Sequence, residues 1–415
     1  MHRLTGLVRR WTCLQREHVL SSEQDSPEED SSEDESPGSP MDTSSPPPEE
    51  SRVYPGHPYF ALEEIFGSSI DMNDTGITRP LIGRLHSLND IKLPPVDHPL
   101  LLFGDENGKG PFWQMDNPKQ FRSAFDLGFR LCNYLLNTPS VLGGVEKWYL
   151  EDIPITPNLL ERTNKFLRSR ACTERLTYIV CTREKSSPQR TRATIKRAGK
   201  KTDEQKECKG CMYIKQDKCT FGCTGPKVAP SVDPYCQDMY TEFNSEFGEY
   251  ARDFKRSKED SSLDMRCGHL RINFVFAITL LHELIHLLEY IAAPAHVPAK
   301  DLQPHPNDYE IHFHQHDDSE EWGCAWENDF MGGFLSADDE GELLPVYGLC
   351  LLKPFDDPNT GMSITELVPM DRVLNWFSKS LLDEVFYHGG DWPVETDVMT
   401  MTIDPNTNKW QLLRQ

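Results

Sequence analysis

Residues 280–288, Leu-Leu-His-Glu-Leu-Ile-His-Leu-Leu, are the most informative stretch of this 415-residue chain. They continue an apolar run that begins near Ile272, and leucine and isoleucine surround the three polar residues His282, Glu283 and His286. On a helix, His282 and His286 lie one turn apart on the same face. A helix that is apolar on all sides is expected to be buried, and buried polar groups are costly unless they have partners.

A metal ion would supply such partners. Two histidines one helical turn apart can bind one zinc ion, and a glutamate between them can contact a metal-bound water. We therefore predict His282 and His286 as zinc ligands, with Glu283 beside a metal-bound water. The alternative is a helix that carries the same three residues merely as surface, and the surrounding leucines argue against it.

The motif His-Glu-x-x-His resembles that of the zincin metallopeptidases. In the metzincin branch a glycine and a histidine follow at fixed spacing, whereas this chain has Glu289 and Ala292 in those places. The chain is more similar to the gluzincins, which take their third ligand from a glutamate on a later helix. This resemblance implies a zincin-like fold, a Zn²⁺ cofactor, a peptide or protein substrate, and peptide hydrolysis with Glu283 as general base.

The third ligand is expected in residues 317–328, which begin with good N-capping residues and are typical of a helix. Glu321 lies in a Glu-x-Gly context that resembles the ligand-bearing helix of gluzincins, and it is the first candidate. Glu327 and Glu320 are the alternates. They are seven residues apart and share a helical face, so that one could bind zinc while the other orients a ligand.

The chain departs from the gluzincin pattern after these candidates. Gluzincins often carry an aspartate four residues after the ligand glutamate, where Cys324 and Ala325 stand here. A second possible source of the third zinc ligand lies just upstream. There the histidines alternate, so in an extended segment they would line one face, namely His312, His314 and His316. The sequence also leaves open which residue would stabilise an oxyanion, with Tyr309, His314 and Tyr347 as candidates.

Two other function classes remain besides an active peptidase. One is a catalytically silent zincin-fold protein that binds metal or acts as an adaptor. The other is a nucleic-acid-associated factor, which the formal net charge of −23 disfavours because a duplex-binding domain should present a dominant basic face.

Residues 1–52 are predicted to be a disordered, acidic, Ser/Pro-rich tail. Between Ser21 and Ser51 the chain has Ser, Pro, Asp and Glu in abundance, no basic residue and no apolar period, so it cannot offset its ordering entropy. The first twenty residues lack the apolar core of a secretory signal, although their arginines also resemble a mitochondrial targeting segment. The apolar run before His282 is too short for a membrane span. We expect an intracellular protein, cytoplasmic or nuclear.

The folded part is predicted to be α+β and mainly helical, with an active-site helix and a small sheet. Its first part covers residues 53–182, and its catalytic part covers residues 234–415. Apolar spacing predicts helices over 118–136, 157–170, 233–257 and 370–386, and β-forming residues predict strands over 175–182 and 343–353.

Residues 183–233 are predicted to be a basic, Cys-rich insertion. Their first part carries eight basic residues without an apolar pattern, which is typical of a solvated loop or a basic patch. Near the end stand four cysteines that could hold a structural zinc, Cys208, Cys211, Cys219 and Cys223. Free thiols and disulfides are the alternatives for them. The other cysteines are scattered and are expected to pack as small apolar residues.

Overall fold

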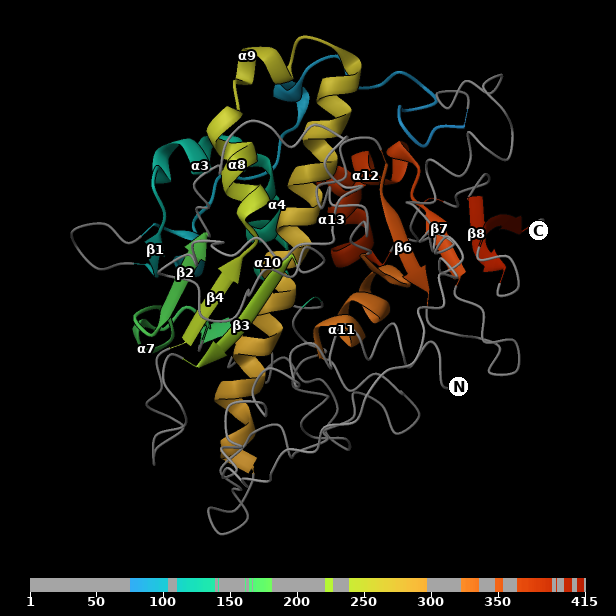
Figure 1. The fold of residues 1–415 in the computed structure, drawn as a ribbon. Helices are drawn as coiled ribbons and strands as arrows, with labels where there is room; N and C mark the ends of the chain where they lie inside the picture. The colour runs from blue at the N-terminus through green and yellow to red at the C-terminus, as the bar shows by residue number, and fades with distance from the viewer. Residues whose placement is uncertain are drawn as a thin grey trace, which may run out of the picture.

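The long helix α10 (Leu263–His296) runs through the middle of the molecule between two β-sheets (Figure 1). The structure is a computed structural model, and it describes residues 75–103, 110–138, 141, 161, 164–165, 167–180, 221–226, 239–296, 322–335, 348–353, 364–389, 393, 399–404 and 409–413. These residues form helices and two small sheets, so the prediction of a mixed α+β, mainly helical chain is confirmed.

Helix α10 is the centre of the core. Every residue from Cys267 to Leu287 is buried except His286, which is partly exposed. Among the described residues α10 is the one helix long and apolar enough to cross a membrane, but 94% of its apolar window is buried inside the protein. A helix that other elements cover on all sides needs this composition for packing alone, and the described residues give no clear membrane span.

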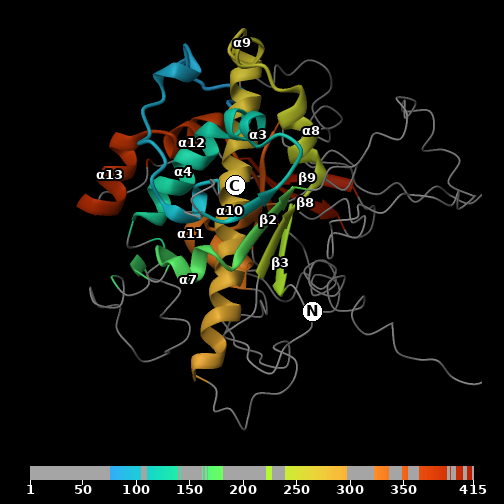
Figure 2. The same ribbon diagram turned by 90° about the vertical axis from the view of Figure 1, so that its left-hand side faces the viewer.

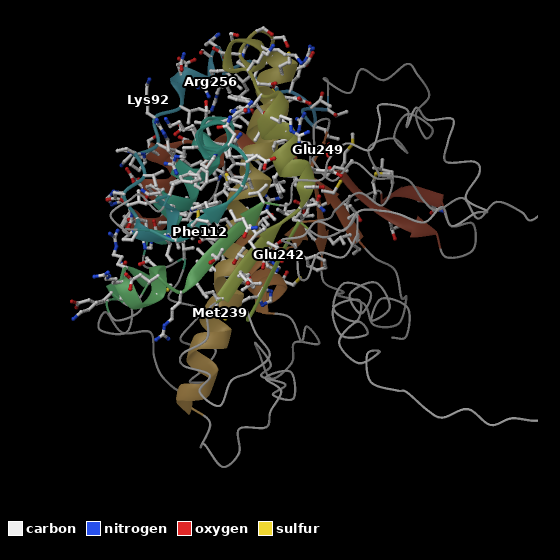
Figure 3. All side chains as sticks on the ribbon, turned by 60° about the vertical axis from the view of Figure 1, so that its left-hand side comes forward. Lys92, Phe112, Met239, Glu242, Glu249 and Arg256 are labelled. Carbon is white, nitrogen blue, oxygen red and sulfur yellow. The ribbon has the colours of Figure 1, made fainter. Side chains whose placement is uncertain are left out.

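The first sheet has four strands in the order β1-β2-β4-β3. Its strands are β1 (Phe112–Gln114), β2 (Leu176–Val180), β4 (Met239–Phe243) and β3 (Gly222–Pro226). The first three are parallel, and β3 pairs antiparallel with β4 at one edge. Figure 3 shows Met239 and Glu242 of β4 in front of α10. Strand β3 contacts α10 directly, so this edge of the sheet lies beside the helix that carries the histidines.

The second sheet has five antiparallel strands in chain order. They are β5 (Phe334–Leu335), β6 (Cys350–Lys353), β7 (Ile364–Leu367), β8 (Met399–Asp404) and β9 (Lys409–Leu413). Three helices accompany this sheet, α11 (Trp322–Met331), α12 (Met370–Trp376) and α13 (Lys379–His388). Helices α11 and α12 both contact α10.

Helices α3 (Pro118–Ala124) and α4 (Asp126–Leu136) lie with the first sheet on the side of α10 that faces the viewer in Figure 2. The side chain of Asn117 accepts a hydrogen bond from the backbone N–H of Gln120, which caps α3. The aromatic rings of these elements meet those of the sheet, of helix α8 (Ser245–Asp253) and of α10 in one cluster, Trp113, Phe121, Phe125, Phe129, Tyr178, Phe243, Phe247 and Phe276.

The described chain also has short helices at its edges. They are η1 (Leu88–Asp90), η2 (Pro99–Leu101), α7 (Arg170–Thr173), α8 (Ser245–Asp253) and α9 (Arg256–Glu259). Helix α8 packs on α3, and α9 contacts the beginning of α10.

Three sequence predictions are corrected by the structure. The single helix expected over 233–257 is wrong in its first half, because Met239–Phe243 is strand β4 and the helix α8 begins at Ser245. Residues four apart share a face in a strand as well as in a helix, so the apolar spacing did not distinguish the two. The helices expected over 118–136 and 370–386 are each two helices, with breaks at Phe125 and at 377–378.

The strand expected over 175–182 is confirmed as β2, and the end of that expected over 343–353 as β6. Within the predicted insertion 183–233, Gly222–Pro226 forms edge strand β3 of the first sheet. Residues 1–52, half of 157–170 and the basic run at 183–201 lie outside the described residues.

Candidate metal centre

The site is built around His282, whose ring is held from both α10 and α11. Its Nδ1 lies 2.7 Å from Oε1 of Glu327, a residue of α11 that is 5% exposed. A carboxylate accepts hydrogen bonds, so we assign the proton to Nδ1 of His282. That tautomer leaves a lone pair on Nε2, the nitrogen on the other side of the ring.

The Nε2 atoms of His282 and His286 lie 3.3 Å apart. Two nitrogens bound to one zinc at about 2.0–2.1 Å with near-tetrahedral angles are separated by about 3.3 Å, so the spacing fits a shared zinc ion. The same distance also suits a long N–H···N hydrogen bond between the rings. The chemistry of the pair favours metal, since both nitrogens come from one face of a buried helix and Nδ1 of His282 is already occupied by a carboxylate.

Gly323 of α11 makes room for the ring of His282. A Cβ atom built on Gly323 would come within 2.5 Å of Cδ2 of His282 and nearer still to Nε2 and Cε1. Only glycine allows the backbone of α11 to approach the imidazole this closely. Glu327 follows Gly323 by four residues and lies on the same face of α11. This face therefore contacts His282 through the backbone at Gly323 and through the carboxylate of Glu327.

Glu283 is buried against the edge of the first sheet. It is 3% exposed, and a Cβ atom built on Gly222 of β3 would lie 2.7 Å from its Oε1. The carboxylate therefore lies over the backbone of the edge strand. The two histidines and this glutamate come from neighbouring positions of α10, and β3 and α11 approach them through glycines.

The turn after α11 also contacts Glu327. Gly332 has a φ of 73° and its N–H donates to the carbonyl of Asn328 at 2.8 Å, which ends the helix. The chain then returns, and the N–H of Leu335 in β5 donates to Oε2 of Glu327 at 2.7 Å. Both oxygens of Glu327 are thus engaged, one by the backbone and one by His282.

The structure describes only part of the predicted ligand set. Within the described residues, no group of three or more His, Cys, Asp or Glu side chains forms a metal cluster. Glu321, Glu320 and residues 305–316 lie outside these residues. So do Cys208, Cys211 and Cys219, while Cys223 lies in β3, where the backbone alone is described.

The scattered cysteines within the described residues are buried, as expected for small apolar residues. They are Cys132, Cys172, Cys267, Cys324 and Cys350. Burial raises the pKa of the Cys172 thiol to about 12 and that of Cys267 to about 11. Thiols with raised pKa values are poor nucleophiles, so these two have a packing role.

The sequence alone did not indicate Gly222 and Gly323 as site residues. Glycine inside a helix or strand often marks a close approach of another backbone or side chain, and that signal was present at both positions. It does not name the group that approaches.

We compared the chain with known protein families, with curated proteins and with solved structures. No match was found in any of the three comparisons. The assignment of a function to this site therefore rests on its own residues.

Proposed function

We propose that this chain is a zinc-dependent metallopeptidase with a zincin-type, gluzincin-like site. The observation that carries the proposal is the 3.3 Å separation of the Nε2 atoms of His282 and His286, with Nδ1 of His282 held by Glu327. A carboxylate on the second nitrogen of a histidine is the usual support for a metal-binding imidazole, because it fixes the tautomer and the ring orientation.

In this proposal each residue has a defined task. His282 and His286 hold zinc, which when bound would supply Lewis acidity to water and to a substrate carbonyl. Glu283 accepts a proton from the attacking water and returns it to the nitrogen of the leaving amine. Its burial favours this task, because a carboxylate with little competing solvent keeps its position beside the histidines.

The substrate we propose is a peptide or protein segment in extended conformation. Strand β3 pairs with β4 on one side, and no other described strand pairs with its remaining edge. An extended peptide can add to an open strand edge through backbone hydrogen bonds. Gly222 of β3 lies against Glu283, so a peptide beside β3 would lie near the base.

For the third ligand we keep Glu321 as the first candidate and Glu320 as an alternate; both lie outside the described residues. The carboxylate that contacts His282 is Glu327, and four residues before it, where gluzincins often have their ligand, stands Gly323. We assign Glu327 to orienting His282, since both of its oxygens are already engaged.

A second candidate function is a zincin-fold protein that binds metal, or acts as an adaptor, without catalysis. The absence of a side chain at Gly323 favours it, because α11 then offers no side-chain ligand at a position whose Cβ would lie directly against Nε2 of His282. Both candidates predict a metal at the histidine pair, and they differ in the role of Glu283.

The test combines metal analysis with peptide cleavage by the full chain. We expect wild type to hold zinc at this site and the His282→Ala, His286→Ala double variant to lose it, while Glu283→Gln keeps zinc and cleaves no member of a broad peptide library. Glu321→Ala should weaken zinc binding by about 10-fold or more, and Glu320→Ala less.

Different outcomes point to different conclusions. A double variant with the zinc content of wild type would exclude the histidine pair as the metal site. Zinc binding without cleavage by wild type would favour the silent protein, and equal cleavage by wild type and Glu283→Gln would remove Glu283 from catalysis. If Glu320→Ala loses more zinc than Glu321→Ala, the third ligand is reassigned to Glu320.

A further inference from the structure

An ion-pair network around a buried glutamate joins the second sheet to the end of α11. Glu366 of β7 has a side chain that is 5% exposed, and its two oxygens pair with two cations, Arg372 of α12 and Lys353 of β6. The side chain of Arg372 is 21% exposed and that of Lys353 is 39% exposed. The pair that excludes more water is therefore the one between Glu366 and Arg372.

Arg372 makes a second contact that Lys353 does not share. Its Nη2 donates to the backbone carbonyl of Met331 at 2.8 Å, while its Nη1 donates to Glu366. Met331 is the last residue of α11, and the final carbonyls of a helix have no partner within the helix. The planar guanidinium can hold a carboxylate and a carbonyl together, which a lysine ammonium does less well.

The carbonyl of Met331 lies at the start of the turn that supports the candidate site. Within four residues the chain passes through Gly332 and reaches Leu335, whose N–H donates to Glu327. The other oxygen of Glu327 contacts Nδ1 of His282. Pairing of β5 with β6 holds the end of this turn, and Arg372 holds its beginning.

We infer that Arg372 is a positioning residue for the candidate site: held by Glu366, its guanidinium fixes the carbonyl end of α11 and thereby the contact between Glu327 and His282. The importance of this contact for a metal rests on the proposed function. The contact between Glu327 and His282 does not depend on the proposed function, so it can be tested in metal-free protein.

The test observes the hydrogen bond of His282 directly, by NMR of the full ¹⁵N-labelled chain after removal of metal with a chelator. An imidazole N–H that donates to a buried carboxylate gives a proton resonance far downfield, and its loss in His282→Gln assigns it. We expect Arg372→Met to lose this resonance or move it upfield. Lys353→Met is the matched control, since it also removes a cation from Glu366 but leaves the carbonyl of Met331 held, and it should keep the resonance.

Arg372→Lys keeps the proposal testable if Arg372→Met does not fold. Its ammonium retains the charge beside Glu366 but lacks the planar fork, so we expect the resonance to shift while the fold is kept. A resonance identical to that of wild type in the folded Arg372 variants would overturn the inference, and so would equal loss in Lys353→Met.

A zinc titration adds the functional readout. Arg372→Met should bind zinc about 10-fold more weakly than wild type, and Lys353→Met as tightly as wild type. If wild type binds no zinc, the proposed function fails while the NMR result still decides whether Arg372 positions His282.

Discussion

At the scale of single residues, the site depends on how closely α11 approaches His282. Gly323 lets the helix backbone lie against the imidazole, and Glu327, one turn later, reaches Nδ1 of the same ring. The ring is thus confined on one side by a main chain and on another by a carboxylate. A residue with any side chain at position 323 would have to displace the ring or the helix.

We predict that Gly323→Ala lowers zinc affinity and stability, although alanine is more favourable than glycine inside a helix by about 1 kcal/mol. The added methyl group would overlap the ring of His282, and such overpacking typically costs about 1–3 kcal/mol. Zinc affinity should therefore fall, as measured by titration, together with the stability in urea.

The control is Gly389→Ala, where φ is 71° and no atom lies within 4 Å of the added methyl group. It should cost stability through backbone strain but leave zinc affinity unchanged, and unchanged zinc affinity in Gly323→Ala would contradict the prediction.

At the scale of elements, a side chain of α10 bridges the break between helices α3 and α4. The side chain of Asn273 donates to the carbonyl of Ala124 at 3.2 Å and accepts from the N–H of Gly128 at 2.8 Å. It thereby satisfies the backbone groups that are left at the break between α3 and α4. A Cβ atom on Gly128 would lie 2.7 Å from the carbonyl oxygen of Asn273, so glycine is required for α4 to pack this closely on α10.

We predict that Asn273→Ala lowers the free energy of unfolding by about 2–4 kcal/mol. The substitution leaves two buried backbone groups without their partner, and each such group costs about 1–3 kcal/mol. Urea unfolding measures the loss. The same change at exposed Asn89 should cost less than about 0.5 kcal/mol. Equal stability of the two variants would show that the helix break does not need Asn273.

At the scale of the whole molecule, the core contains histidines that are kept neutral. Burial, reinforced by the charge of Arg256, lowers the pKa of His269 to about 3, and Asp260 opposes this weakly. Burial and Arg168 lower the pKa of His98 to about 4. The hydroxyl of Tyr250 lies 2.5 Å from Nδ1 of His269, and both side chains are held between α8 and α10.

We predict that these histidines make the fold sensitive to acid. The unfolded chain takes up their protons below pH 6.5, whereas the folded chain does so only near pH 3 for His269 and near pH 4 for His98. Their stabilisation is therefore complete above pH 6.5 and is lost as the pH falls towards those values, by about 1.4 kcal/mol per pH unit for each group.

Urea unfolding at several pH values between 6.5 and 4.5 measures this dependence. His269→Gln should reduce the slope of stability against pH by about 1.4 kcal/mol per unit, because glutamine does not titrate. His388→Gln, a change at an exposed position, should leave the slope as in wild type. The same slope in all three proteins would show that His269 is not buried as a neutral side chain.

Much of the local structure could be predicted from the sequence. Strand β2 has the expected β-forming residues, and α10 has the unbroken apolar composition of a buried helix. The errors have two physical causes. Apolar spacing of four residues suits a strand as well as a helix, which misled the prediction for Met239–Phe243. The break at Phe125 is bridged by hydrogen bonds with the side chain of Asn273, a residue far away in the sequence, and apolar spacing carries no information on such a contact.

For the candidate site, the sequence by itself determined the two histidines one turn apart, the glutamate between them and the apolar helix that buries them, because these features depend only on helical spacing. It also left three glutamates in competition, and Glu320 and Glu321 lie outside the described residues. Only the tertiary structure decided that Glu327 contacts His282, that Gly323 lies against the same ring and that Gly222 lies against Glu283. These contacts join residues far apart in the chain, so they are set by how α11 and β3 pack on α10 and not by any local pattern.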